Sequence, residues 1–190
     1  MNRFVLLFLA LLITQFGIAQ ENNNIIEWSS EKLTWEDFKG KPNISSEFIA
    51  VNAGKIDISS KDPITALTKK IHLTIRALFY KEVSWTITNS RKILQHEQLH
   101  TDIREVHARM LRKTILEKTE FTSAQNAQKL FDIVYSELDK KMRLTQGKYD
   151  DETDHSTNNK RQKDWNKKVA KQLEELKYYI NNEIIITIKK

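Results

Sequence analysis

The 190-residue sequence contains no cysteine. Neither disulfide bonds nor thiolate metal ligands can therefore contribute to its fold or its chemistry. An exported protein without disulfides must be stabilised by its hydrophobic core, to which a bound metal can add. The absence also excludes a lipid-anchored bacterial lipoprotein, because the lipid of such a protein is attached to a cysteine near the cleavage point.

Long apolar runs are also missing, apart from one at the N-terminus. Arg3 precedes an uninterrupted apolar run over residues 4–13, and Gly17-Ile18-Ala19 supplies the small residues that a signal peptidase accepts. The run is too short to span a bilayer, which needs roughly 20 apolar residues. We therefore predict that residues 1–19 are a signal peptide and that residues 20–190 form one domain. This domain is expected in the periplasm or outside the cell, without stable membrane insertion, and a retained N-terminal anchor is the alternative.

The formal net charge is +6, but no arginine-rich stripe interleaved with aromatic residues is present. The basic residues alternate with acidic ones, as in Lys160-Arg161-Gln162-Lys163-Asp164, which is typical of a solvated face. We therefore expect no nucleic-acid partner.

The pattern of apolar residues predicts an α+β protein with a β-rich first half and a helical second half. Strands are expected over residues 48–58, 70–79, 83–88 and 183–188, from β-branched residues and alternation. Helical spacing begins after Asn89 or Ser90, either of which can cap a helix. Further helices are predicted over residues 123–145 and 160–179. Gly147 is expected to end the second helix, and residues 148–158 to form a polar loop.

The segment His96-Glu97-Gln98-Leu99-His100 lies within the first predicted helix. Residues four apart in a helix differ by about 40° around the axis and about 6 Å along it, so both imidazoles share one face. Two Nε2 atoms can then bind one Zn²⁺ at about 2.0–2.1 Å each. Glu97 is rotated by about 100° from His96, so it flanks the metal and can act as the general base for a zinc-activated water.

A catalytic zinc usually has three protein ligands and one open position. His155 is the predicted third ligand, because it lies in a polar loop after a helix that can fold back on the first. The neighbouring carboxylates at positions 150, 151, 152 and 154 are rival ligands. His107 lies about 10 Å further along the helix than His100, so it is expected to be a surface or packing residue, and His72 to be a half-exposed strand residue. Tyr149 either donates a hydrogen bond to the oxyanion of the reaction or packs in the core.

These residues resemble the DUF922 family of bacterial predicted zinc proteases. The resemblance rests on Ser84-Trp85, on the segment from Leu94 to Ile103, and on Tyr149-Asp150-x-x-Thr153-x-His155. The early segment Trp35-x-Asp37-Phe38-x-Gly40-x-Pro42 adds to it, so the resemblance spans about residues 28–170. Ser156 stands where a glycine often follows the last histidine. The resemblance implies zinc-dependent peptidase activity and a zincin-like fold, but no particular substrate.

We therefore predict a secreted zinc-dependent peptidase in which Zn²⁺ is held by His96, His100 and His155, and which acts on a peptide or protein. An extended substrate is expected to pair with the edge of the strand over residues 71–79. One alternative is a catalytically inactive, zinc-stabilised binding module of the same fold. Another is a zinc hydrolase acting on a non-peptide amide.

Overall fold

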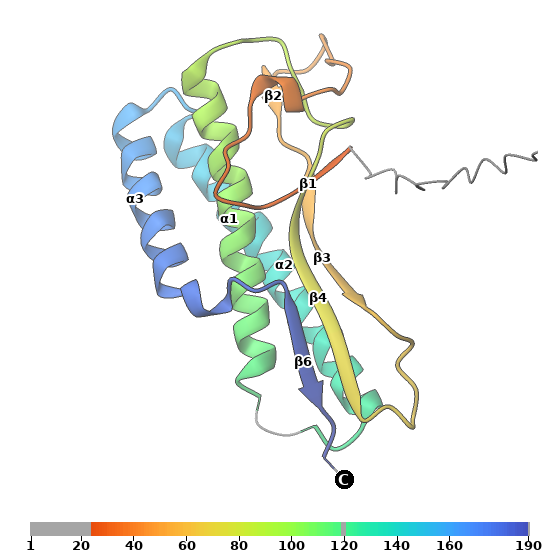
Figure 1. Cartoon of the computed structure of the whole chain (residues 1–190). Helices are drawn as coiled ribbons and strands as arrows, with labels where there is room; N and C mark the ends of the chain where they lie inside the picture. Colours follow the sequence, from red (N-terminus) through yellow and green to blue (C-terminus); the bar gives the residue numbers. More distant parts are fainter. Residues whose placement is uncertain (1–23, 119–120, 190) are drawn as a thin grey trace, which may run out of the picture.

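The computed structural model describes residues 24–118 and 121–189. It has the predicted α+β organisation, with strands in the first half and helices in the second (Figure 1). The predicted signal peptide lies outside the described residues. Within the described segments, no helix combines the length and apolar character needed to cross a membrane.

Strand β4 (Lys70–Tyr80) is the centre of a four-stranded antiparallel sheet. β3 (Gly54–Ser60) pairs along one edge of β4, while β1 (Ile25–Glu27) and β6 (Glu183–Thr187) pair with the two ends of its other edge. Both edges of β4 are therefore covered. The prediction that an extended substrate pairs with this strand is wrong, because its backbone groups already bond to neighbouring strands.

The predicted alternation along β4 is confirmed. Ile71, Leu73, Ile75 and Ala77 are buried on one face, and His72 is exposed on the other. The buried face meets α1 (Arg91–Leu116) and α2 (Ala124–Thr153), which cover the sheet (Figure 1). Removing this apolar face from water is the main stabilising contribution to the two layers.

Helix α1 begins after Ser90, as predicted, and it lies between the sheet and α3 (Asn159–Glu175) (Figure 1). Leu99, Ile103 and Val106 of α1 pack with Trp165 and Val169 of α3 in a second apolar cluster. A short 3-10 turn, η2 (Lys177–Tyr179), then leads from α3 to β6. Because α1 is enclosed by sheet and helices, even its polar residues from His96 to Arg112 are mostly buried.

The second helix departs from its predicted end. α2 continues through Gly147 to Thr153, so most of the predicted loop is helical. Glycine within a helix costs only about 1 kcal/mol relative to alanine, and the packing of α2 against α1 and α3 offsets this. The chain turns only at Asp154, His155 and Ser156, which all have positive φ angles. This extension puts Tyr149 and Asp150 on a rigid helix.

Three short elements complete the chain near the start of α1. The 3-10 turn η1 (Trp35–Asp37) is followed by β2 (Ala50–Val51), which pairs with β5 (Trp85–Thr86) in a separate two-stranded sheet. Phe38 stacks edge-on against Phe79 with ring centroids 5.1 Å apart, which anchors this region to the end of the main sheet.

Candidate metal centre

His96 and His100 lie on one face of α1, as their spacing predicts. Their ring centroids are 5.0 Å apart and their planes differ by 83°. His96 is buried, and His100 is half-buried at the surface of a pocket. Both Nε2 atoms point to the same carboxylate on α2.

That carboxylate belongs to Asp150. Its Oδ1 atom lies 3.1 Å from Nε2 of His96 and 2.9 Å from Nε2 of His100. Each of the three residues offers one possible metal-binding atom, and these atoms all lie within 4.8 Å of one another. Burial alone raises the pKa of Asp150, but its close contacts with the imidazoles of His100 and His96 outweigh it and hold this pKa well below its usual range. The site thus gathers two imidazoles and an ionised carboxylate.

His155 is not part of this group, although we predicted it as the third ligand. Its ring lies edge-on to Phe48, with centroids 6.0 Å apart, and it borders the same pocket. Asp150, one of the rival carboxylates, is the third member of the group with His96 and His100, because the helix does not end at Gly147. The continuing helix turns Asp150 toward α1 and carries His155 past the end of α2.

Tyr149 packs behind the site and is absent from the pocket lining. Its ring is stacked on His96 with centroids 4.5 Å apart. Its hydroxyl lies 2.9 Å from Oε1 of Gln162, to which it donates, and 3.2 Å from the carbonyl oxygen of His96. Burial raises the pKa of Tyr149 above its usual value, so the hydroxyl stays neutral. This geometry agrees with the packing alternative and not with a hydrogen bond to a substrate oxyanion.

Gln162 of α3 orients His96, a role that the sequence alone did not indicate. Its Oε1 atom lies 3.2 Å from Nδ1 of His96 and also accepts the hydroxyl of Tyr149. An amide oxygen has two lone pairs and can accept both bonds. The Nε2 atom of Gln162 donates to Asn166 at 2.9 Å, which fixes the orientation of the amide. Nδ1 of His96 therefore carries a proton, and Nε2 faces Asp150.

Glu97 is buried but lines the pocket. Among the described residues, its carboxylate forms no hydrogen bond or ion pair. Burial raises the pKa of Glu97, and the electrostatic influence of His100 and His96 opposes that rise without reversing it. An acidic group without a partner, beside two imidazoles and open to a pocket, is available to exchange a proton with a small molecule.

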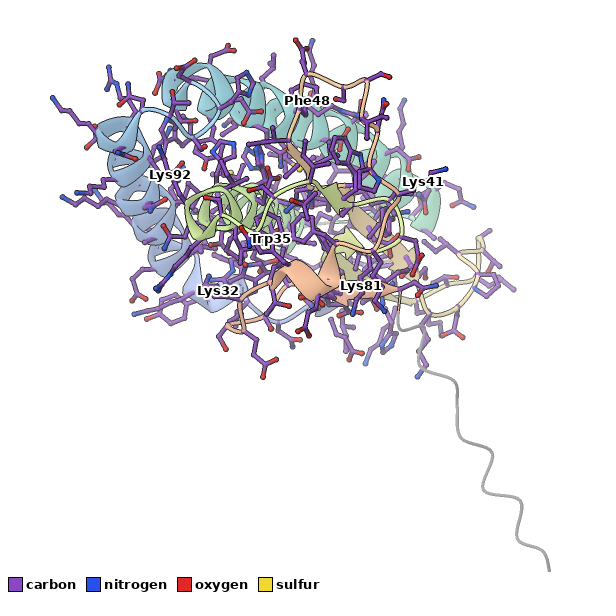
Figure 2. The ribbon with its side chains drawn as sticks, turned by 90° about the horizontal axis from the view of Figure 1, so that it is seen from above. Lys32, Trp35, Lys41, Phe48, Lys81 and Lys92 are labelled. Carbon is purple, nitrogen blue, oxygen red and sulfur yellow. The ribbon has the colours of Figure 1, made fainter. Side chains whose placement is uncertain are left out.

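The first half of the chain supplies the opposite wall of the pocket. Asn52 donates through Nδ2 to the carbonyl oxygen of Glu97 at 2.7 Å and to Oγ1 of Thr101 at 2.8 Å. Arg104 in turn donates to Oδ1 of Asn52 at 3.2 Å. These bonds tie the end of β2 to α1, and the pocket between them has a volume of about 600 Å³. Figure 2 shows Phe48, from this wall, on the α2 side of α1, and Lys32 on the opposite side.

The two remaining histidines lie outside the group, as predicted. His107 is buried, and its Nδ1 atom lies 2.9 Å from the carbonyl oxygen of Ile103. Burial lowers its pKa, so it packs as a neutral side chain. His72 is exposed on the far face of the sheet.

Comparison with known families places this site within one segment that matches a family model. Residues 81–156 match the model of a family described as "Bacterial protein of unknown function (DUF922)". The match supports the resemblance to DUF922. It contains β5, α1 and the whole of α2, and with them His96, Glu97, His100 and Asp150. Gln162 lies beyond the DUF922 match. No curated protein and no solved structure matches the chain.

Proposed function

We propose that this chain is an exported zinc-dependent peptidase with a zincin-like arrangement, in which Glu97 is the general base. One observation carries the proposal: His96, His100 and Asp150 converge, and the unpaired carboxylate of Glu97 stands beside them in an open pocket. Two imidazoles and one carboxylate are a ligand set found in catalytic zinc sites.

The hydrogen bonds around His96 fit a cation at this position. Because Nδ1 donates to Gln162, Nε2 of a neutral His96 presents its lone pair to the carboxylate of Asp150, 3.1 Å away. Two lone pairs at this distance repel, so a positive charge must lie between them, either a proton or a metal ion. A hydrogen bond to the outer nitrogen of a ligating histidine is the usual way in which proteins fix such a ligand.

The residues of the site have different roles in the proposed reaction. His96, His100 and Asp150 would hold the ion, and Gln162 and Tyr149 keep the ring of His96 in place. Zinc bound there would supply Lewis acidity, which polarises a carbonyl and acidifies water. Glu97 accepts a proton from a water molecule in the pocket and returns it to the leaving amine. The buried setting of Glu97 raises its pKa, which makes its carboxylate a stronger base for the first of these steps.

Activity measurements on the purified chain without residues 1–19 test this proposal. Denatured casein and a peptide library are incubated with the zinc-loaded protein, with and without a chelator. We expect cleavage that the chelator abolishes and added zinc restores. Glu97→Gln is expected to keep about one zinc per chain and to lose nearly all activity, because an amide cannot take the proton. Glu137→Gln, at an exposed position on α2, is the matched control.

The outcomes separate the peptidase from the alternatives. Stoichiometric zinc without cleavage of any peptide would exclude the peptidase and leave two alternatives, the zinc-stabilised binding module and the hydrolase of a non-peptide amide. Cleavage at the original rate by Glu97→Gln would show that another group is the base.

A further inference from the structure

β2 has one free backbone edge. In its pairing with β5, Ala50 lies opposite Thr86 and Val51 opposite Trp85, and the N–H of Ile87 donates to the carbonyl oxygen of Ile49 at 2.9 Å. In such an antiparallel ladder, residues 49 and 51 bond to the partner strand, and the residue between them points its N–H and C=O the other way. Among the described residues, no backbone group forms a hydrogen bond with the N–H or the C=O of Ala50.

This free edge borders the pocket of the metal centre. The whole segment 47–52 lines the pocket, together with Glu97 and His100. Asn52 holds the end of the segment to the backbone of Glu97 at 2.7 Å, so the distance between this edge and α1 is set by a direct bond. β4, by contrast, has no free edge. The unpaired backbone groups of β2 can therefore form hydrogen bonds with an extended chain that enters the pocket.

The same pocket has an apolar side. Phe48 lines it and is 45% exposed, although aromatic side chains of this size are mostly buried. Ile93 lines it too, from the position on α1 three residues before His96. An exposed aromatic ring beside a few convergent polar groups is typical of a site that binds an apolar ligand group. His155 supports the ring of Phe48 from the turn after α2, with centroids 6.0 Å apart.

We propose that the substrate is an extended polypeptide segment that pairs with the free edge at Ala50 and places a bulky apolar side chain against Phe48 and Ile93. This inference names the substrate of the proposed peptidase. Cleavage of the segment rests on that proposed function, whereas its binding does not. The substrate class is flexible or unfolded segments with leucine- or phenylalanine-like residues beside the bond that is cleaved. A helical segment cannot bind in this way, because its backbone groups bond to one another.

Binding to zinc-loaded Glu97→Gln protein tests the proposal without cleavage. Fluorescent peptides that differ only in a central phenylalanine, leucine, glycine or aspartate are titrated, and their anisotropy is recorded. We expect the phenylalanine and leucine peptides to bind tightest. In the Glu97→Gln background, Phe48→Ala should weaken their binding by about 10-fold or more and change the glycine peptide by less than about 3-fold. Tyr178→Ala, which removes an 84% exposed aromatic ring from η2, is the control and should change nothing.

Single N-methyl groups along the phenylalanine peptide test the strand pairing. One residue of the peptide lies opposite Ala50, and a methyl group on its backbone nitrogen should abolish binding. The peptide residues before and after it should tolerate the methyl group, because alternate residues point to opposite edges. Equal binding of all four peptides would overturn the proposal. It would also be overturned if Phe48→Ala weakened the binding of all four peptides by the same factor. If the apolar preference depends on Phe48 but the wild-type chain cleaves none of these peptides, the peptidase function fails and the binding site stands.

Discussion

Nδ1 of His96 lies 3.2 Å from Oε1 of Gln162, which joins the first helix of the metal centre to the last helix of the chain. Tyr149 of α2 donates to the same oxygen at 2.9 Å. Three helices thus meet at one amide oxygen, directly behind a ring that faces the pocket. The orientation of His96 therefore depends on the packing of α3, which lies outside the segment that matches DUF922.

Gln162→Ala is expected to weaken zinc binding by about 10- to 100-fold, because His96 loses the acceptor that orients it. Activity should return when zinc is added in excess, and Gln162→Glu, which keeps an acceptor oxygen, should restore much of the affinity. Competition with a chromogenic chelator measures the affinity. Lys163→Ala, exposed one residue further on, is the control. Unchanged affinity in Gln162→Ala would show that the bond does not position His96.

Asp150→Asn and His155→Ala distinguish the two candidates for the third ligand. Asp150→Asn should lose most of the bound zinc, because Oδ1 of Asp150 is the atom that meets both imidazoles. His155→Ala should keep about one zinc per chain, since three ligands suffice for a catalytic site. Substitution of His107 or His72 should leave the stoichiometry unchanged. Atomic emission after dialysis measures it. If His155→Ala lost its zinc and Asp150→Asn kept it, His155 would be the third zinc ligand.

Glu105 is expected to be essential for stability. It is almost fully buried and pairs with Arg112 at 2.9 Å and with Arg109 at 2.8 Å. Glu105→Ala leaves two buried guanidinium groups without their carboxylate, which costs about 3–5 kcal/mol in the free energy of unfolding. Urea denaturation measures the loss. Glu175→Ala, which removes an exposed pair with Lys171, should cost at most about 1 kcal/mol. Similar losses for the two variants would contradict this role of Glu105.

Asp57 on β3 should contribute stability that disappears in acid. Burial raises its pKa, but hydrogen bonds from Arg76 and Lys55 outweigh it, so the pKa of folded Asp57 lies below its usual value of 3.8. A lowered pKa in the folded state stabilises the protein above the unfolded value, and this contribution is lost as the pH falls below about 4. Asp57→Asn should therefore lower the Tm at pH 7 and have a smaller effect at pH 3. An equal effect at both pH values would exclude the ionic contribution.

Export is tested by the mature N-terminus. If residues 1–19 are a signal peptide, the secreted protein begins at Gln20. N-terminal sequencing of protein from the medium or periplasm decides this. An intact N-terminus in the membrane fraction would indicate a retained anchor.

Local geometry let the sequence predict much of this protein. The alternation of Ile71, Leu73 and Ile75 marks the buried face of β4, because successive strand residues point to opposite sides. The four-residue spacing of His96 and His100 puts both imidazoles on one helix face, because a helix turns every 3.6 residues. Each of these features depends on neighbours in the sequence, and the structure has both of them.

Tertiary packing decided the rest of the candidate site. Gly147 permits a turn without requiring one, and only the packing of α2 on α1 and α3 shows that the helix continues and turns Asp150 toward His96 and His100. The bond from Gln162 to His96 spans 66 positions in the sequence, so no local pattern predicts it. The free edge of a strand is likewise a property of the assembled sheet: β4 is covered on both sides, and β2 is open on one. A side chain's own sequence neighbourhood sets which way it points from its element, but only the packing of the elements sets what it meets there.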